Sequence, residues 1–249
     1  SDTITVIEKI GHFLDQENIK LFRSYVEEGH SNKDISSLIA KNLSIESILK
    51  NASADWDGGY TMAGLLGHGD AFVLRDPSGI RPAFWYEDDE VLVVTSERPV
   101  IQTAFNVKWE NVQELNPGHA LIIKKDNSVN EVLINQPKQI AKCSFERIYF
   151  SRGTDKDIYK ERLTLGNLVT AQVLESINYD LKNTVFSFIP NTAEMSYFGM
   201  VKAAEDYLTR VKKSKVEKLD PKSPDYGKKL DEILSIRTRA EKIMVKDAK

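Results

Sequence analysis

The sequence predicts an α+β protein, because two amphipathic helices come first, short strands follow, and helical patterns return after them. Residues 2–28 carry apolar side chains at helical spacing, with Asp2 as the candidate N-cap and Gly29 as the stop. Residues 31–49 predict a second amphipathic helix. From about 59 to 133, short runs of β-forming residues alternate with Gly, Asp, Pro and Asn, so antiparallel strands are expected there.

Five strands are expected, at 60–66, 71–74, 83–86, 91–95 and 120–124. The polar connection 135–142 is the expected boundary between one domain, residues 1–138, and a second, residues 139–249. In the second domain we expect a short strand at 148–151, a helix at 158–179, a buried strand at 184–189 and a helix at 193–208. The last two form half of a βαβ unit whose continuation is expected outside the chain. The charged stretch at about 209–242 indicates a solvated insertion with a helix near 226–236.

Composition excludes several classes of protein. With 249 residues, 41% hydrophobic, 29% charged and a net charge of −3, the chain has no basic field for nucleic acid. No apolar run is long enough to span a bilayer, and the single cysteine, Cys143, cannot form an internal disulfide. These features favour a cytoplasmic protein that binds neither nucleic acid nor membrane. Both ends have the character of cuts inside a longer protein.

The segment LRDPSGIRP, residues 74–82, reads as a type I turn between two strands, which by itself indicates only a β-hairpin. Its sequence also resembles the RDP-x-GIRP segment in the glutaminase domain of amidophosphoribosyltransferases. Further similarities to this family follow in the same order along the chain, at 57–60 (DGGY), 67–69 (GHG), 96–97 (SE), 116–120 (NPGHA), 143–152 (CSFERIYFSR) and 159–166 (YKERLTLG). Each is weak alone, whereas the ordered set over most of the chain is specific.

The resemblance implies the second half of an N-terminal-nucleophile-type αββα glutaminase domain, followed by the start of an α/β phosphoribosyltransferase domain. In this family, glutamine-derived ammonia converts phosphoribosylpyrophosphate to phosphoribosylamine in purine biosynthesis, with Mg²⁺ and usually as a homo-oligomer. The family's nucleophile is a Cys at position one, and its phosphate loop carries two adjacent Asp residues. Neither is present here, so the resemblance predicts that this chain alone is inactive.

The resemblance also assigns candidate site residues. Asp2 matches an Asp that pairs with the glutamine α-ammonium, although it can equally be a helix cap. The segment 189–194, IPNTAE, matches a step that binds phosphoribosylpyrophosphate and metal, which makes Asn191, Thr192 and Glu194 candidates. Two departures put metal binding there in doubt, since Asn191 replaces an acidic residue and Ala193 replaces a Ser.

Cys143 matches a position that ligates an iron–sulfur cluster in some relatives. A cluster normally needs four thiolates, so a structural thiol is favoured over a cluster ligand. Two alternatives to the enzyme stay open: a non-catalytic regulatory or scaffolding relative that keeps the fold, and another class II glutamine amidotransferase.

Overall fold

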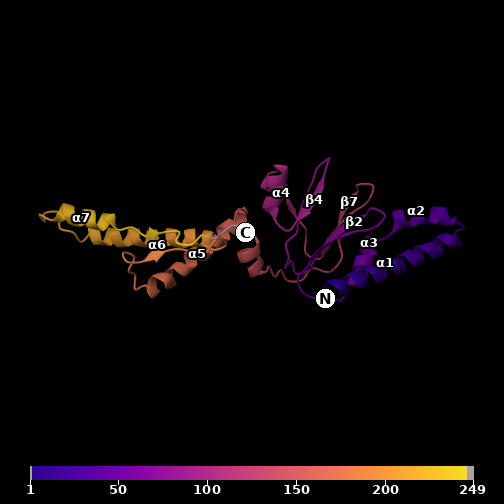
Figure 1. Ribbon diagram of the computed structural model, residues 1–249, viewed down its shortest axis with the longest axis horizontal. Helices are drawn as coiled ribbons and strands as arrows, with labels where there is room; N and C mark the ends of the chain where they lie inside the picture. The colour runs from indigo at the N-terminus through magenta and orange to yellow at the C-terminus, as the bar shows by residue number, and fades with distance from the viewer. Residues whose placement is uncertain (1, 246–249) are drawn as a thin grey trace. The chain divides into compact units, whose positions relative to one another are not determined.

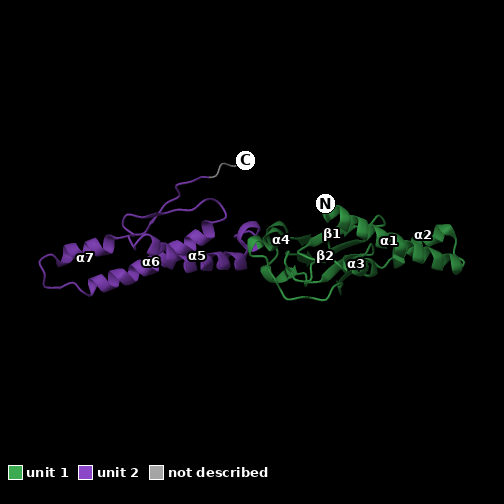
Figure 2. Ribbon diagram, turned by 90° about the horizontal axis from the view of Figure 1, so that it is seen from below, with its two compact units in different colours: residues 1–146 green, residues 147–249 purple. Residues whose placement is uncertain are grey.

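The computed structural model describes residues 2–245 and contains two compact units, unit 1 (residues 1–146) and unit 2 (residues 147–249) (Figures 1 and 2). The connection after the last strand of unit 1 stays attached to that unit, because the Lys138 amide donates to the Pro77 carbonyl and the Ala141 amide donates to the Ser78 carbonyl. The division between the units therefore comes a few residues after the expected domain boundary at 138/139. The domain assignments themselves stay predictions.

Unit 1 begins with the predicted long helix, α1 (Asp2–Glu27), which is confirmed. The chain leaves this helix through Gly29 at φ 84°, a left-handed conformation that favours glycine. The expected N-cap is wrong in detail, because Asp2 is the first helical residue and lies inside the first turn. Ser1, which precedes it, lies outside the described residues.

The single helix expected over residues 31–49 is two helices, α2 (Asn32–Asn42) and α3 (Ile45–Ser53). Ser44 separates them, because its side chain accepts a hydrogen bond from the Ser47 amide at 3.2 Å and so caps α3. Leu43 and Ile45, on either side of this cap, are buried. The apolar residues of the two helices continue at helical spacing across the break, so periodicity alone did not reveal it.

The strands of unit 1 form two antiparallel sheets. One has the order β1-β2-β6-β7 and the other β4-β3-β5. The five expected strands are confirmed as β1 (Thr61–Leu65), β2 (Ala71–Arg75), β3 (Phe84–Glu87), β4 (Leu92–Thr95) and β6 (His119–Ile123). The structure has four further elements that were not expected: β5 (Gln113–Glu114), β7 (Val129–Leu133), helix α4 (Arg98–Phe105) and the 3-10 turn η1 (Trp109–Asn111).

Alternating side chains divide the core of unit 1 between the two faces of the larger sheet. On one face, Phe72 and Leu74 pack with Leu49 of α3. On the other face, Val73 and Leu121 pack against Trp85 and its neighbours in the second sheet. Helix α4 contacts β3 and β4 of that second sheet. The larger sheet therefore packs against α3 on one face and against the second sheet on the other, and the mixed α+β class is confirmed.

Unit 2 is built on two long helices, α5 (Lys156–Ser176) and α6 (Glu194–Val216), both close to their predicted positions. Its core contains Phe186, Tyr197 and Leu208, and α7 (Tyr226–Ser235) confirms the helix expected in the charged stretch. No helix among residues 2–245 combines the length and apolar character needed to cross a bilayer.

Three expectations for unit 2 are wrong. Residues 148–151 do not form a strand: residues 148–150 belong to a π-helical turn, η2 (Glu146–Phe150), and Ser151 follows it. The buried strand expected at 184–189 is reduced to β8 (Val185–Phe186), and Ile189 is 72% exposed. The parallel partner of β8 lies inside the chain, because β9 (Arg239–Ala240) pairs with it and completes a short βαβ unit.

Candidate functional site

The turn after β2, which carries the most distinctive sequence motif, is held together by buried charges. The Asp76 carboxylate is fully buried and accepts hydrogen bonds from the amides of Ser78, Ile80 and Arg81 at 2.9–3.0 Å. The amide of Gly79 donates to the Asp76 carbonyl at 3.2 Å, as the predicted type I turn requires. Every described contact of this carboxylate is to the turn itself, so Asp76 has a structural role.

Arg75 supports the same turn from within the protein. Its guanidinium donates to the carbonyls of Arg81, Leu115 and Gly79, and it pairs with Glu114 at 2.9 Å. Its side chain is 3% exposed, so the buried charge is balanced by Glu114 and by backbone carbonyls. The motif therefore stabilises a loop.

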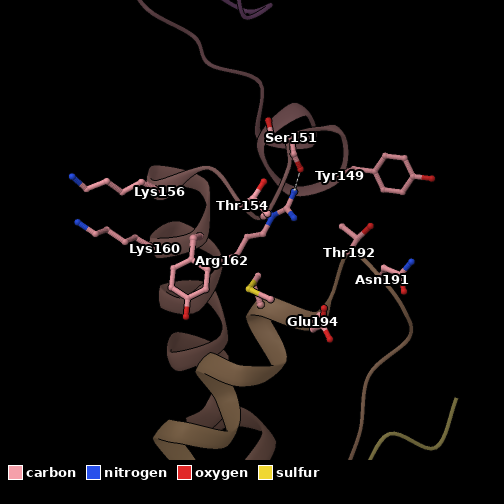
Figure 3. Close-up of a pocket in the computed structure, with 12 residues that line it drawn as sticks. Tyr149, Ser151, Thr154, Lys156, Lys160, Arg162, Asn191, Thr192 and Glu194 are labelled. Carbon is pink, nitrogen blue, oxygen red and sulfur yellow. Dashed lines mark hydrogen bonds between the residues drawn. The ribbon is translucent and has the colours of Figure 1, made fainter. Parts of the chain in front are cut away.

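A pocket of about 790 Å³ in unit 2 is the strongest candidate site (Figure 3). It brings together the three residues that the sequence assigned to phosphoribosylpyrophosphate binding, Asn191, Thr192 and Glu194. The peptide bond between Pro190 and Asn191, at its edge, is cis. The remaining lining comes from η2, from the loop after it and from the starts of α5 and α6: Tyr149, Ser151, Gly153, Thr154, Lys156, Tyr159, Lys160, Arg162 and Met195.

Arg162 is the buried cation of this pocket. It is 5% exposed, and in Figure 3 its guanidinium lies beside Ser151 and Thr154, facing Thr192. Its Nε and Nη2 donate to the carbonyls of Arg147 and Ser151, the shortest contact being 2.6 Å. Within residues 2–245 its Nη1 makes no hydrogen bond, and no carboxylate pairs with it. Burial lowers the pKa of Arg162, yet a guanidinium remains protonated at any physiological pH.

The neighbouring Arg147 differs from Arg162. Its guanidinium forms a two-pronged pair with the Glu161 carboxylate, with one contact at 2.6 Å, and this pairing raises the pKa of Arg147. Glu161 is thereby engaged away from Arg162. Arg162 lies inside the motif at 159–166, but the family resemblance implied no role for it. Its position in that motif, near the start of the predicted helix at 158–179, is the signal that could have marked Arg162 as a binding residue.

The starts of α5 and α6 both line the pocket, but they are capped differently. Asp155 caps α5 by accepting hydrogen bonds from the amides of Asp157 and Ile158. Ala193 stands at the N-cap of α6 and has no side-chain oxygen to offer. The positive end of the α6 dipole and its first amides therefore remain available to an anion in the pocket.

The charges of the lining favour an anion over a cation. Lys156, Lys160 and Arg162 contribute three positive charges, whereas Glu194 is the one carboxylate among the lining residues. No group of three or more His, Cys, Asp or Glu side chains suited to a metal ion occurs in the described part of the chain. Mg²⁺ prefers near-octahedral oxygen ligands, several of them carboxylate or phosphate. The residues at this step thus do not fit a protein-held Mg²⁺.

The other two sequence-predicted site residues lie in unit 1. Asp2 is exposed in the first turn of α1, a position where a carboxylate complements the helix dipole. Cys143 is a half-buried thiol in the connection after β7. The glutamine-binding role of Asp2 and the structural role of Cys143 stay predictions.

Curated proteins with similar sequences share one name. The chain is 32% identical over 124 residues to an amidophosphoribosyltransferase of Methanothermobacter thermautotrophicus, with 47% of this chain and 25% of that protein covered. It is 30% identical over 147 residues to the Saccharomyces cerevisiae protein of the same name, with 55% and 28% covered. The matched part thus spans about a quarter of these relatives. No protein-family model matches the chain.

Solved structures with the same fold carry related names. The glutamine phosphoribosylpyrophosphate amidotransferase of Bacillus subtilis, solved with ADP and GMP, superposes with a TM-score of 0.51 at 21% identity, covering 76% of this chain and 42% of that one. A structure described as the allosteric regulatory enzyme of purine biosynthesis gives the same TM-score of 0.51 at 22% identity. The chain is therefore a homologue of amidophosphoribosyltransferases over the part of those proteins that it spans.

Proposed function

We propose that this chain is the central part of an amidophosphoribosyltransferase, joining a glutaminase domain to a phosphoribosyltransferase domain. In the parent protein, ammonia released from glutamine would attack C1 of phosphoribosylpyrophosphate. A C–N bond forms, the C1–O bond to pyrophosphate breaks, and one proton leaves the nitrogen. The homology supports the activity, and the packing of two sheets face to face with helices against them supports the N-terminal-nucleophile assignment.

The observation that carries the proposal is the pocket of unit 2. Its lining includes Asn191, Thr192 and Glu194, which the family resemblance implies for substrate binding, together with the buried cation Arg162, to which the resemblance gave no role. A doubly phosphorylated sugar needs positive charge and amide donors, and its pyrophosphate leaves as an anion. Cations and a helix N-terminus already oriented toward that anion stabilise the charge that develops as the bond breaks.

Glutamine would be held in unit 1, where the Asp2 carboxylate pairs with the substrate α-ammonium. The thiol nucleophile and the acidic phosphate loop would come from segments that this sequence does not contain. We therefore expect the 249-residue chain alone to hydrolyse no glutamine and to release no pyrophosphate.

The test compares this chain with the longer protein from the same gene. Glutamine-dependent and ammonia-dependent consumption of phosphoribosylpyrophosphate are measured for both. Activity with either nitrogen source in the longer protein would support the proposal. A longer protein that carries the nucleophile Cys and the two adjacent Asp residues but is inactive with both would favour the non-catalytic relative. Glutamine hydrolysis coupled to another acceptor would favour another class II amidotransferase.

A single substitution tests whether the pocket serves this reaction. In the longer protein, Thr192→Val removes a hydroxyl while nearly keeping the shape of the side chain. This variant should raise the KM for phosphoribosylpyrophosphate. Thr209→Val is the matched control, because the Thr209 hydroxyl donates to the Glu205 carbonyl within α6 and does not line the pocket. Equal KM values in the two variants would mean that Thr192 does not contact the substrate.

A further inference from the structure

We propose that the pocket of unit 2 binds phosphate groups through direct contact with Arg162 and the first turn of α6, without a divalent cation at the 189–194 step. The proposal rests on the proposed function for the class of ligand, a phosphorylated sugar or its pyrophosphate. It adds how this chain neutralises that ligand, and it departs from what the family resemblance implies for the metal.

The first argument is the incomplete set of contacts around Arg162. A buried charge is costly unless a counter-charge or enough hydrogen bonds offset it. Backbone carbonyls of Arg147 and Ser151 satisfy Nε and Nη2, and Nη1 has no acceptor among the described residues. The Nη1 atom lies near Gly153, at the pocket wall, where an added Cβ would be 3.5 Å from it. An anion in the pocket would supply the missing acceptor and the counter-charge together.

The second argument is the uncapped start of α6. The Glu194 amide donates to the Asn191 carbonyl at 3.2 Å, and no side chain caps the amides that follow. A Ser or Asp at position 193 would occupy those amides or hold a metal nearby. Ala193 does neither, and the first two residues of α6, Glu194 and Met195, line the same pocket as Arg162.

The third argument is that the pocket would neutralise phosphate without a metal. Three cationic side chains line it, and Lys160 extends from α5 on the side opposite Thr192 in Figure 3. Glu194 is the one carboxylate among the lining residues. Two nearby carboxylates outside the lining have other partners: Asp155 caps α5, and Glu161 pairs with Arg147. A metal bound only through Glu194 would sit among cations that repel it.

The experiment titrates the 249-residue chain with inorganic pyrophosphate by calorimetry at low ionic strength, once with EDTA and once with excess Mg²⁺. We expect saturable binding in EDTA that is at least as tight as binding in Mg²⁺, because Mg²⁺ reduces the charge of the ligand. Binding that appears only with Mg²⁺, or no binding in either buffer, would overturn the proposal.

Two further variants locate the binding. Ala193→Asp should weaken pyrophosphate binding in EDTA about tenfold. The new carboxylate would repel the ligand, and it would accept hydrogen bonds from the first amides of α6 in the ligand's place. It should still fold, because Asp is a favoured N-cap residue. Lys160→Gln should weaken binding, whereas the charge-matched Lys222→Gln, at an exposed position outside the pocket, should not. Unchanged affinity in both Ala193→Asp and Lys160→Gln would place the ligand elsewhere and contradict the proposal.

The proposed function and this inference can fail separately. Transferase activity in the longer protein, combined with strictly Mg²⁺-dependent pyrophosphate binding here, would retain the function and reject the inference. If the 249-residue chain binds pyrophosphate without metal but the longer protein is inactive, the anion site is retained and the proposed enzymatic function is rejected.

Discussion

The contact between α5 and α6 depends on glycine, and Gly166→Ala should therefore destabilise unit 2. A Cβ built on Gly166 would lie 1.8 Å from the Ser196 carbonyl oxygen and 2.8 Å from the Met200 amide nitrogen, both backbone atoms of α6. The relation is reciprocal, since a Cβ on Gly199 would lie 2.1 Å from the Leu163 carbonyl oxygen. Backbone atoms cannot rotate out of the way, so the two helices would have to separate.

The magnitude follows from two opposing effects. Alanine favours a helix over glycine by about 1 kcal/mol, which stabilises the variant. Restoring an ordinary van der Waals contact requires the helices to separate by more than an ångström, and overpacking of this kind costs about 1–3 kcal/mol or more. Separation also weakens the dispersion contacts along the whole interface, which includes the Thr170 hydroxyl near the Met200 carbonyl at 3.4 Å. We expect a net loss of about 2 kcal/mol.

The assay uses the placement of the tryptophans. Trp56, Trp85 and Trp109 all lie in unit 1, so tryptophan fluorescence reports that unit, whereas far-UV circular dichroism reports the helices of both. In urea, Gly166→Ala should move the circular dichroism transition to lower denaturant and leave the fluorescence transition unchanged. The control is Gly227→Ala in α7, where no atom lies within 4 Å of the added Cβ, and it should be neutral or stabilising. If both variants raised stability equally, the close crossing of α5 and α6 would be wrong.

Three other substitutions test the remaining features. Asp76→Asn should cost unit 1 about 1–3 kcal/mol in urea followed by fluorescence, because an amide can no longer accept from all the turn amides that the carboxylate serves; an unchanged midpoint would contradict the structural role. At Asp70, burial opposes ionisation, but hydrogen bonds from Lys124, His68 and the Lys125 amide outweigh it and hold the pKa of Asp70 below its usual value. The stability this carboxylate contributes is therefore present above about pH 4 and lost as the pH falls through the lowered pKa, so Asp70→Asn should flatten the acid limb of the pH–stability curve. In an active longer protein, Asp2→Asn should lower kcat/KM for glutamine about tenfold to a hundredfold and spare the ammonia-dependent reaction; an equal loss in both would make Asp2 a structural residue.

Long periodic segments were predictable from the sequence because local signals decide them. Helices α1, α5, α6 and α7 were found from apolar spacing, and the five strands from β-forming runs bounded by turn residues. The break before α3 was not found, because the apolar spacing continues through Ser44 and only the cap reveals the interruption. Strands β5 and β8 have two residues each, too few to leave a periodic signal.

The π-helical turn η2 shows tertiary structure overriding local preference. Residues 148–151 are rich in β-forming side chains, but no strand among residues 2–245 pairs with them. Arg162 of α5 instead binds the carbonyls of Arg147 and Ser151, at the two ends of this segment, and holds the chain in a turn. No pattern within 148–151 could have predicted a partner eleven or more residues further along the chain.

One part of the candidate site could be predicted from the sequence and another could not, because only the first depends on a local stretch of residues. Asn191, Thr192 and Glu194 were named because the segment 189–194 resembles a family motif, and such a motif is a short contiguous stretch of sequence. Arg162 was not assigned a role, because its contribution depends on which carbonyls it satisfies and which nitrogen remains unsatisfied. Those facts follow from the packing of η2 against α5, which the sequence pattern does not specify.

The most recognisable motif and the candidate site are different parts of the molecule, and physical reasons explain why. The turn at 74–82 needs a carboxylate that serves several amides, a buried guanidinium that serves several carbonyls, and a glycine at φ 61°. Few residue combinations meet all of these demands, so the motif identifies the fold through its structural role. Anion binding is less demanding, because a pocket needs only positive charge and free amides, which several residue types supply. In the proposed anion site, Asn191 and Ala193 can therefore depart from the family pattern and still leave anion binding possible. The protein's own cations and amides then neutralise the charge that a metal would otherwise neutralise.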